Sequence, residues 1–148
     1  MENVVFFETI TQTKSNVYIL PMIIITVIMS SLFIGIVFAA KNTSISINDR
    51  EIVINSFIYG RKIPIENVLT NEIKTINLRI DKEYGVKIRT NGIALPGFCS
   101  GWMRLKNGKK ALVFLTDTQN VLLMPTKDFI VMFSMKERDE FIDKIKSR

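Results

Sequence analysis

The feature that most constrains this chain is an uninterrupted stretch from Ser15 to Ala40 that contains no Asp, Glu, Lys or Arg. Apolar residues dominate it from Val17 onward, and a helix over residues 17–40 measures about 36 Å at 1.5 Å per residue. The hydrocarbon core of a bilayer is about 30 Å thick and is crossed by about 20 helical residues. We therefore predict three parts: an N-terminal tail at residues 1–16, a transmembrane helix at residues 17–40 and one domain at residues 41–148.

A cleaved signal peptide is the alternative to a retained membrane helix. Val37-Phe38-Ala39 has the form of a small-residue cleavage site. However, the apolar run is longer than the roughly 7–15 residues of a signal h-region, and the residues before it carry no positive excess. A retained anchor therefore fits the sequence better.

The orientation of this helix is predicted from the Lys and Arg residues beside it. Lys14 is the only basic residue before the span, whereas Lys41 and Arg50 follow it within about 20 residues. Since basic residues favour the cytoplasmic side, we predict a single-pass cell-membrane protein with a cytoplasmic C-terminal domain. An extracytoplasmic, envelope-associated domain is the alternative.

One face of the predicted membrane helix carries small residues. Ser31, Gly35 and Ala39 recur at intervals of four. This spacing lets two membrane helices approach closely, although small residues are frequent in membrane helices for other reasons as well. A homodimer formed through this face is therefore one expected partner arrangement.

The residue types limit the chemistry available outside the membrane. The chain has no His and one Cys, Cys99, which excludes His-based acid–base catalysis, His metal sites and an internal disulfide. We expect a protein that is not an enzyme, with no metal and no cofactor. Residues 41–148 carry most of the Lys and Arg, and this basic excess suits an anionic surface or an acidic partner. No nucleic acid is expected as a partner, because no dense Lys/Arg cluster is interleaved with aromatic residues.

Short segments of β-branched, aromatic and alternating residues follow Lys41 and predict a β-rich domain. Asn91-Gly92 and Asn107-Gly108 predict tight turns, because Asn-Gly readily adopts positive φ. The predicted strands cover residues 43–47, 51–58, 61–65, 73–80, 102–106, 109–116, 121–124 and 129–133.

The end of the chain predicts an amphipathic helix. Ser134 and Glu137 have the spacing of a capping box, with Ser134 as the N-cap. Phe141, Ile142 and Ile145 form one apolar stripe, which we expect to pack on the domain. The predicted fold is therefore α+β and mostly β, a transmembrane helix followed by a small sheet or barrel that the last helix closes.

Three segments together resemble bacterial proteins that carry a PH-like (pleckstrin homology-type) domain: residues 93–98 (IALPGF), 101–105 (GWMRL) and 107–117 (NGKKALVFLTD). The resemblance covers residues 41–148. It implies a membrane-proximal helix, a PH-type split β-barrel closed by a terminal helix, and a binding or scaffold module. It does not imply inositol-lipid binding, because the first turn, residues 48–51, mixes acidic and basic residues where eukaryotic PH domains place several Lys and Arg.

Two groups of residues outside the membrane segment are candidate sites. Residues 97–101 have the outline of a nucleophile elbow around Cys99, but no base is available, and a bend that positions Trp102 for packing is the better interpretation. Basic residues at two turns could contact an anionic surface, with ordinary solvated turns as the preferred alternative. These basic residues are Arg61, Lys62, Lys106, Lys109 and Lys110.

These observations predict a membrane-anchored, non-enzymatic PH-like interaction or scaffold module at the cytoplasmic membrane face. Its partner would be a protein or an anionic surface. Two other classes stay open at this point: an extracytoplasmic envelope-associated domain, and a small-ligand sensor or enzyme with a pocket that the sequence does not reveal.

Overall fold

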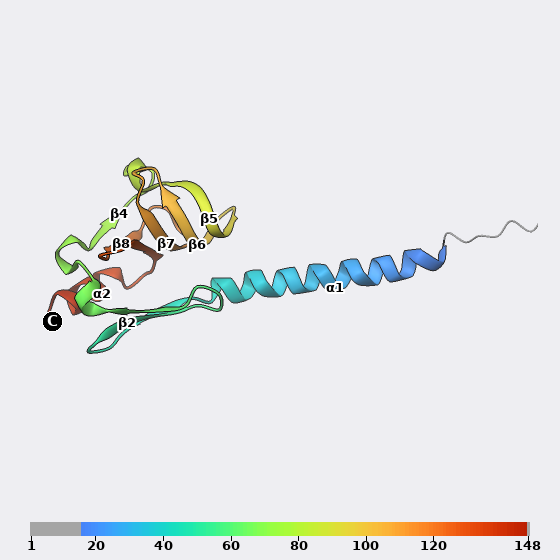
Figure 1. Cartoon of the computed structure of the whole chain (residues 1–148), viewed down its shortest axis with the longest axis horizontal. Helices are drawn as coiled ribbons and strands as arrows, with labels where there is room; N and C mark the ends of the chain where they lie inside the picture. The colour runs from blue at the N-terminus through green and yellow to red at the C-terminus, as the bar shows by residue number, and fades with distance from the viewer. Residues whose placement is uncertain (1–15, 148) are drawn as a thin grey trace, which may run out of the picture. The chain divides into compact units, whose positions relative to one another are not determined.

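The computed structural model describes residues 16–147 and contains two compact units, which divide between Val37 and Phe38 (Figure 1). The predicted N-terminal tail lies, except for Asn16, outside the described residues. The predicted combination of an N-terminal apolar helix, a β-rich domain and a C-terminal helix is confirmed.

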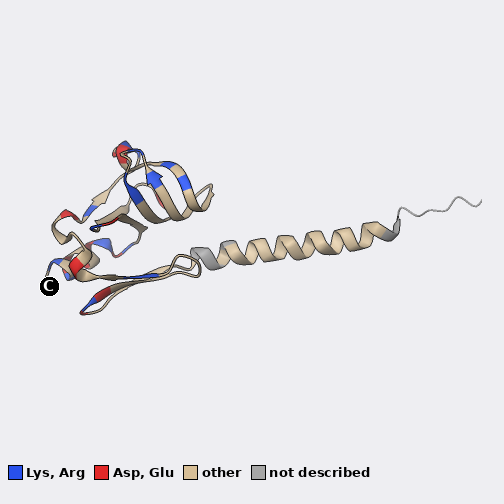
Figure 2. Ribbon diagram, viewed as in Figure 1, with Lys and Arg blue, Asp and Glu red and all other residues tan. Residues whose placement is uncertain are grey.

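The first helix, α1 (Asn16–Lys41), is apolar on all sides. Every large apolar side chain described in it is at least 44% exposed, and Figure 2 shows no charged residue along its described part. The hydroxyls of Thr26 and Ser30 donate to the carbonyls of Met22 and Thr26, so these polar groups are satisfied within the helix. Tyr18–Ile36 is long and apolar enough to cross a membrane, and a signal sequence near the N-terminus would share these properties.

The small-residue face of α1 has room for a neighbouring helix. A Cβ added at Gly35 would meet nothing within 4 Å in the described part of the chain. The side chain of Ala39 lies outside the described residues, and the dimer through Ser31, Gly35 and Ala39 stays a prediction.

The first three strands form a small antiparallel sheet in the order β1-β2-β3. They are β1 (Ser44–Ile47), β2 (Glu51–Asn55) and β3 (Arg61–Pro64). Alternation of residue types along these strands places one face against the core, where Ile52, Ile54 and Ile63 are buried.

The other six strands form a second sheet in the order β4-β8-β9-β7-β6-β5. All neighbours are antiparallel except β7 and β9, which are parallel. The strands are β4 (Lys74–Ile76), β5 (Val86–Leu95), β6 (Phe98–Leu105), β7 (Lys110–Leu115), β8 (Val121–Pro125) and β9 (Ile130–Ser134). Three single turns of 3₁₀ helix connect the elements between β3 and β5, at Ile65–Asn67, Thr70–Glu72 and Lys82–Tyr84.

The central strands of the larger sheet are buried on both faces. Along β7, Leu112 and Phe114 point into one hydrophobic cluster, whereas Ala111, Val113 and Leu115 point into another. The first cluster also receives the small sheet and the last helix, α2 (Arg138–Lys146), through Phe141 and Ile145. Ile142 is half-buried at the edge of the same cluster.

The expected closed barrel is not confirmed, because the strands form two open sheets. The small sheet ends at β3, whose last residue, Pro64, has no backbone N–H to continue a ladder. The chain then enters the 3₁₀ turn Ile65–Asn67, and among the described residues an isolated bridge pairs Val68 with Thr126 beyond it.

The prediction that Ser134 caps the last helix is wrong. Ser134 is the final residue of β9, and α2 begins after Glu137 without a side-chain hydrogen bond at its N-cap. The Ser134 hydroxyl instead donates to the carbonyl of Asp117 at 2.7 Å and accepts the N–H groups of Thr116 and Asp117. It therefore holds the turn between β7 and β8 rather than the helix.

The prediction of a tight turn at Asn91-Gly92 is also wrong, because both residues lie inside β5. Gly92 pairs with Gly101 of β6, and a Cβ on Gly92 would lie 2.5 Å from the carbonyl oxygen of Ser100. The glycines thus allow a close approach of two strands at an irregular point of the ladder. The chain reverses later, at Gly97, which has a φ of 72°.

The strand predicted at residues 73–80 is much shorter in the structure. It ends at Ile76, because Asn77 starts a turn in which its side-chain oxygen accepts the N–H of Arg79. The Asp81 carboxylate accepts the N–H of Asn77 and closes the same turn.

Candidate functional site

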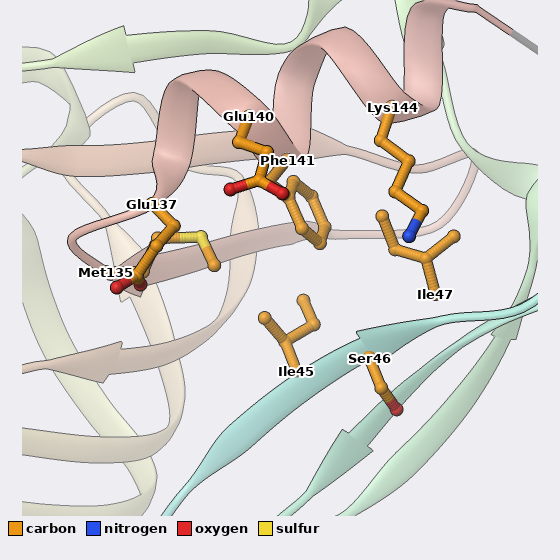
Figure 3. A pocket seen from close by; sticks show the side chains of 8 residues that line it. All are labelled: Ile45, Ser46, Ile47, Met135, Glu137, Glu140, Phe141 and Lys144. Atoms are coloured by element: carbon orange, nitrogen blue, oxygen red, sulfur yellow. The ribbon is translucent and has the colours of Figure 1, made fainter.

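A groove between β1 and α2 is the first candidate site (Figure 3). It has a volume of about 420 Å³. We call it the β1–α2 groove. It is lined by Ile45, Ser46, Ile47, Met135, Glu137, Glu140, Phe141 and Lys144.

The floor of this groove is apolar and its rim is charged. Ile45 and Ile47 point toward Phe141, whereas the Ser46 side chain points away from the helix (Figure 3). Along α2, the carboxylates of Glu137 and Glu140 lie at one end and the Lys144 ammonium lies beside Ile47 at the other. The groove therefore offers apolar contacts with opposite charges at its two ends.

The β1 strand borders this groove with a free edge. Within the described chain it pairs with β2 on one side, and no strand pairs with its other side. An edge strand presents backbone N–H and C=O groups that can pair with an added strand. The β1–α2 groove thus combines hydrogen-bonding backbone, apolar side chains and charges.

The second candidate site is a cluster of two cations and two aromatic rings, which we call the cation–aromatic cluster. Trp102 and Phe129 make an edge-on contact, with ring centroids 5.0 Å apart. The Arg61 guanidinium carbon lies 5.1 Å from the Trp102 ring centroid, and the Lys110 ammonium lies 4.2 Å from it. Trp102 is half-buried against the core, so its ring positions both cations at the surface.

At the Trp102 ring, the structure brings together two of the five basic residues suggested by the sequence. Arg61 comes from β3 and Lys110 from β7, and they meet at Trp102. Lys62 points to Glu51, with which it forms an ion pair at 3.3 Å. Lys106 and Lys109 lie in the β6–β7 turn, and Figure 2 shows further basic residues along β5 and β6.

Cys99 does not sit in a nucleophile elbow. Gly97 belongs to the turn before β6, and residues 98–101 are the first residues of that strand, so no strand-to-helix turn is present around Cys99. Burial raises the pKa of the Cys99 thiol above its usual 9.0, and the positive charge of Arg89 opposes this effect without cancelling it. The thiol is therefore protonated at neutral pH, which does not suit a nucleophile.

Metal binding finds no support in the described residues. Among residues 16–147, no group of three or more Cys, Asp or Glu side chains is arranged to hold a metal ion.

Sequence reasoning missed the β1–α2 groove. The strand at residues 43–47 and the last helix were both predicted, but their contact joins segments about 90 residues apart, which no local pattern encodes. It also missed the partners of Trp102, since Arg61, Lys110 and Phe129 come from three separate elements or loops.

Comparison with known proteins identifies one relationship. No curated protein and no solved structure matches the chain. The family model for the bacterial PH domain matches residues 43–148, which include both sheets and α2. The chain therefore belongs to the bacterial PH domain family.

Proposed function

We propose that this chain is a single-pass membrane protein that holds a non-catalytic PH domain at the cytoplasmic face as an interaction or scaffold module. The observation that carries this proposal is the β1–α2 groove, in which a free strand edge lies beside an apolar floor. Family membership supports the same reading, because PH-like domains generally bind partners rather than catalyse reactions.

The partner we propose for this groove is an extended segment of another protein. Such a segment would add to the free edge of β1 and place alternate side chains over Ile45, Ile47 and Phe141. A basic residue in the segment would lie near Glu137 and Glu140, because their carboxylates give that end a negative charge.

Site-specific photocrosslinking in membranes from cells that express the full chain tests this proposal. A p-benzoylphenylalanine in place of Lys144 should give a discrete adduct, whereas the same residue in place of Asp139, whose side chain is 82% exposed, should give none. Glu137→Lys combined with Glu140→Lys should abolish the adduct. Equal adducts from both positions, or an adduct that survives both charge reversals, would contradict a partner in this groove.

An anionic surface is a second candidate partner, favoured by the cation–aromatic cluster. Arg61 and Lys110 are held side by side on Trp102, and each basic group near an anionic membrane surface contributes about 1 kcal/mol. Lys110→Ala should weaken binding of the domain to vesicles that contain phosphatidylglycerol, whereas Lys62→Ala should do so less because Lys62 pairs with Glu51. If Lys110→Ala and Lys62→Ala weaken vesicle binding equally, the cation–aromatic cluster has no specific role in it.

The cytoplasmic orientation is also part of the proposal. Protease added outside intact cells should spare the domain and cleave it once the membrane is opened. Digestion of the domain in intact cells would favour the envelope-associated alternative and leave the fold unchanged.

A second copy of the chain, packed through Ser31, Gly35 and Ala39, is a further proposed partner, which crosslinking in the same membranes would detect as a dimer.

A further inference from the structure

The turn between β2 and β3 presents two neighbouring apolar side chains to solvent. Phe57 is 74% exposed and Ile58 is 45% exposed. Beyond α1, the other exposed large apolar residues of the described chain are separate from one another in sequence. They are Leu69, Ile80, Ile88 and Leu95. An exposed pair that includes an aromatic ring is the kind of feature that marks a contact surface.

This turn is fixed close to the end of α1. The helix ends at Lys41 and β1 begins at Ser44, so two residues separate them. The Thr43 hydroxyl donates to the Ser56 hydroxyl at 3.3 Å, and Ser44 pairs with Asn55 in the ladder. Figure 1 shows the β2–β3 turn beside the start of β1. Two residues of chain span at most about 7 Å, so Thr43 lies within that distance of Lys41, the last residue of the helix. Ser56 is hydrogen-bonded to Thr43, and Phe57 is the next residue after Ser56.

The length of α1 sets the depth at which it ends. Its 26 residues measure about 39 Å, whereas a bilayer with its headgroup layers is about 40–45 Å thick. A helix that crosses the bilayer therefore ends within the headgroup layer. The Thr43–Ser56 contact then lies at the same level, which brings the turn to the membrane surface.

The turn is also held in a defined shape. The Tyr59 hydroxyl donates to the side-chain oxygen of Asn91 at 3.2 Å. At Gly60, an added Cβ would lie 2.8 Å from the Ser56 carbonyl oxygen, so the backbone there is tightly folded. The exposed Phe57 and Ile58 are consequently presented by a fixed turn rather than by a loose loop.

We propose that Phe57 and Ile58 form a second membrane contact, inserted at the boundary of the headgroups and acyl chains beside the span. The occupant of this apolar surface is the lipid bilayer, because the covalent link through residues 41–44 keeps the turn at the surface whenever α1 spans the membrane. This inference rests on the proposed membrane anchoring. It adds that the domain is held against the membrane at two points.

A fluorescent probe on the full chain tests this contact. Cys99, the only cysteine, is replaced by Ala, and Phe57→Cys is labelled with an NBD group. The protein is reconstituted into vesicles of phosphatidylcholine and phosphatidylglycerol, with and without lipids that carry a nitroxide near the headgroup end of the acyl chain. Ile80→Cys is the matched control, because Ile80 is 77% exposed and lies in the turn that follows β4 on the other sheet.

We expect blue-shifted emission and several-fold stronger nitroxide quenching for the probe at position 57 than for the probe at position 80. Circular dichroism of both labelled proteins should match the parent, and Cys99→Ser provides a second background if Cys99→Ala changes the spectrum. Water-like, unquenched emission from position 57 in protein that floats with the vesicles would overturn the contact and leave the membrane anchor standing. Release of the protein from the vesicles in alkaline carbonate would contradict both the membrane contact of the β2–β3 turn and the membrane anchor.

Discussion

The two helices of this chain use apolar residues in opposite ways. In α1, apolar side chains cover all sides and every large one that is described is exposed. In α2, apolar residues form one stripe, and Phe141 and Ile145 are buried against the core. The difference shows that the spacing of apolar residues along a helix, rather than their number, decides what the helix packs against. A striped helix packs on its own domain, whereas a helix that is apolar all round requires an apolar surrounding.

The largest expected effect comes from removing the Phe141 side chain of α2. Phe141 is buried in the cluster shared by both sheets, so Phe141→Ala leaves a cavity that typically costs about 3–5 kcal/mol. A domain has only about 5–15 kcal/mol of unfolding free energy in total. We expect the melting temperature of the domain, measured by circular dichroism on the full chain in detergent, to fall by more than about 10 °C.

Ile34→Ala in α1 is the matched comparison, because it also shortens a large apolar side chain. Ile34 is exposed, so the substitution should change the unfolding free energy of the domain by less than about 0.5 kcal/mol. Lys144 is exposed at the rim of the β1–α2 groove and not in the core, so Lys144→Ala should have a similarly small effect on the unfolding free energy. If Phe141→Ala melts like the parent, α2 is not docked, and the contrast between the two helices fails.

A smaller effect is expected from removing the Ser134 hydroxyl, and it tests whether Ser134 stabilises the start of α2. Ser134 bonds the β7–β8 turn and not the helix, so Ser134→Ala should cost about 1 kcal/mol through the lost hydrogen bonds. Hydrogen exchange should then increase at the amides of Thr116 and Asp117 and stay unchanged in the first turn of α2. Increased exchange confined to α2 would restore Ser134 as its cap.

The smallest effect concerns the pH dependence of the same turn. The N–H of Gln119 and the side chain of Asn120 bond the Asp117 carboxylate and lower its pKa below the usual 3.8. Because the folded pKa is the lower one, the ionised group stabilises the fold above about pH 3.8, and this contribution is lost as the pH falls through the folded pKa. Asp117→Asn should therefore lie slightly below the parent in stability at neutral pH and converge with it in acid. A constant difference at all pH values would show that ionisation is not the cause.

Sequence patterns predicted the elements whose signal is local. The long uncharged run predicted α1, the alternating and β-branched runs predicted most strands, and the Phe141, Ile142 and Ile145 spacing predicted α2. The strand β5 was missed because Asn91-Gly92 in its middle has the composition of a turn, although Val86-Lys87-Ile88-Arg89 before it alternates apolar and polar residues. An edge strand can carry polar residues wherever its neighbour supplies the hydrogen bonds.

The remaining errors share a different physical cause. Ser134 has the right spacing from Glu137 for a cap, but β9 continues through Ser134, and the nearby Asp117 turn satisfies its hydroxyl first. The β1–α2 groove and the neighbours of Trp102 depend on which distant segments meet. Tertiary contacts of this kind follow from the pairing order of strands, which the residues of a single strand do not determine.

The contrast between the two helices can be tested most directly by extraction of the full chain from membranes. If α1 is an anchor without a partner inside the chain, membranes washed in alkaline carbonate should keep the whole protein in the pellet, with its N-terminal segment intact by mass spectrometry. Release of the protein into the supernatant, or a mature N-terminus at Ala40, would contradict the account, because α1 would then be a peripheral helix or a removed signal sequence.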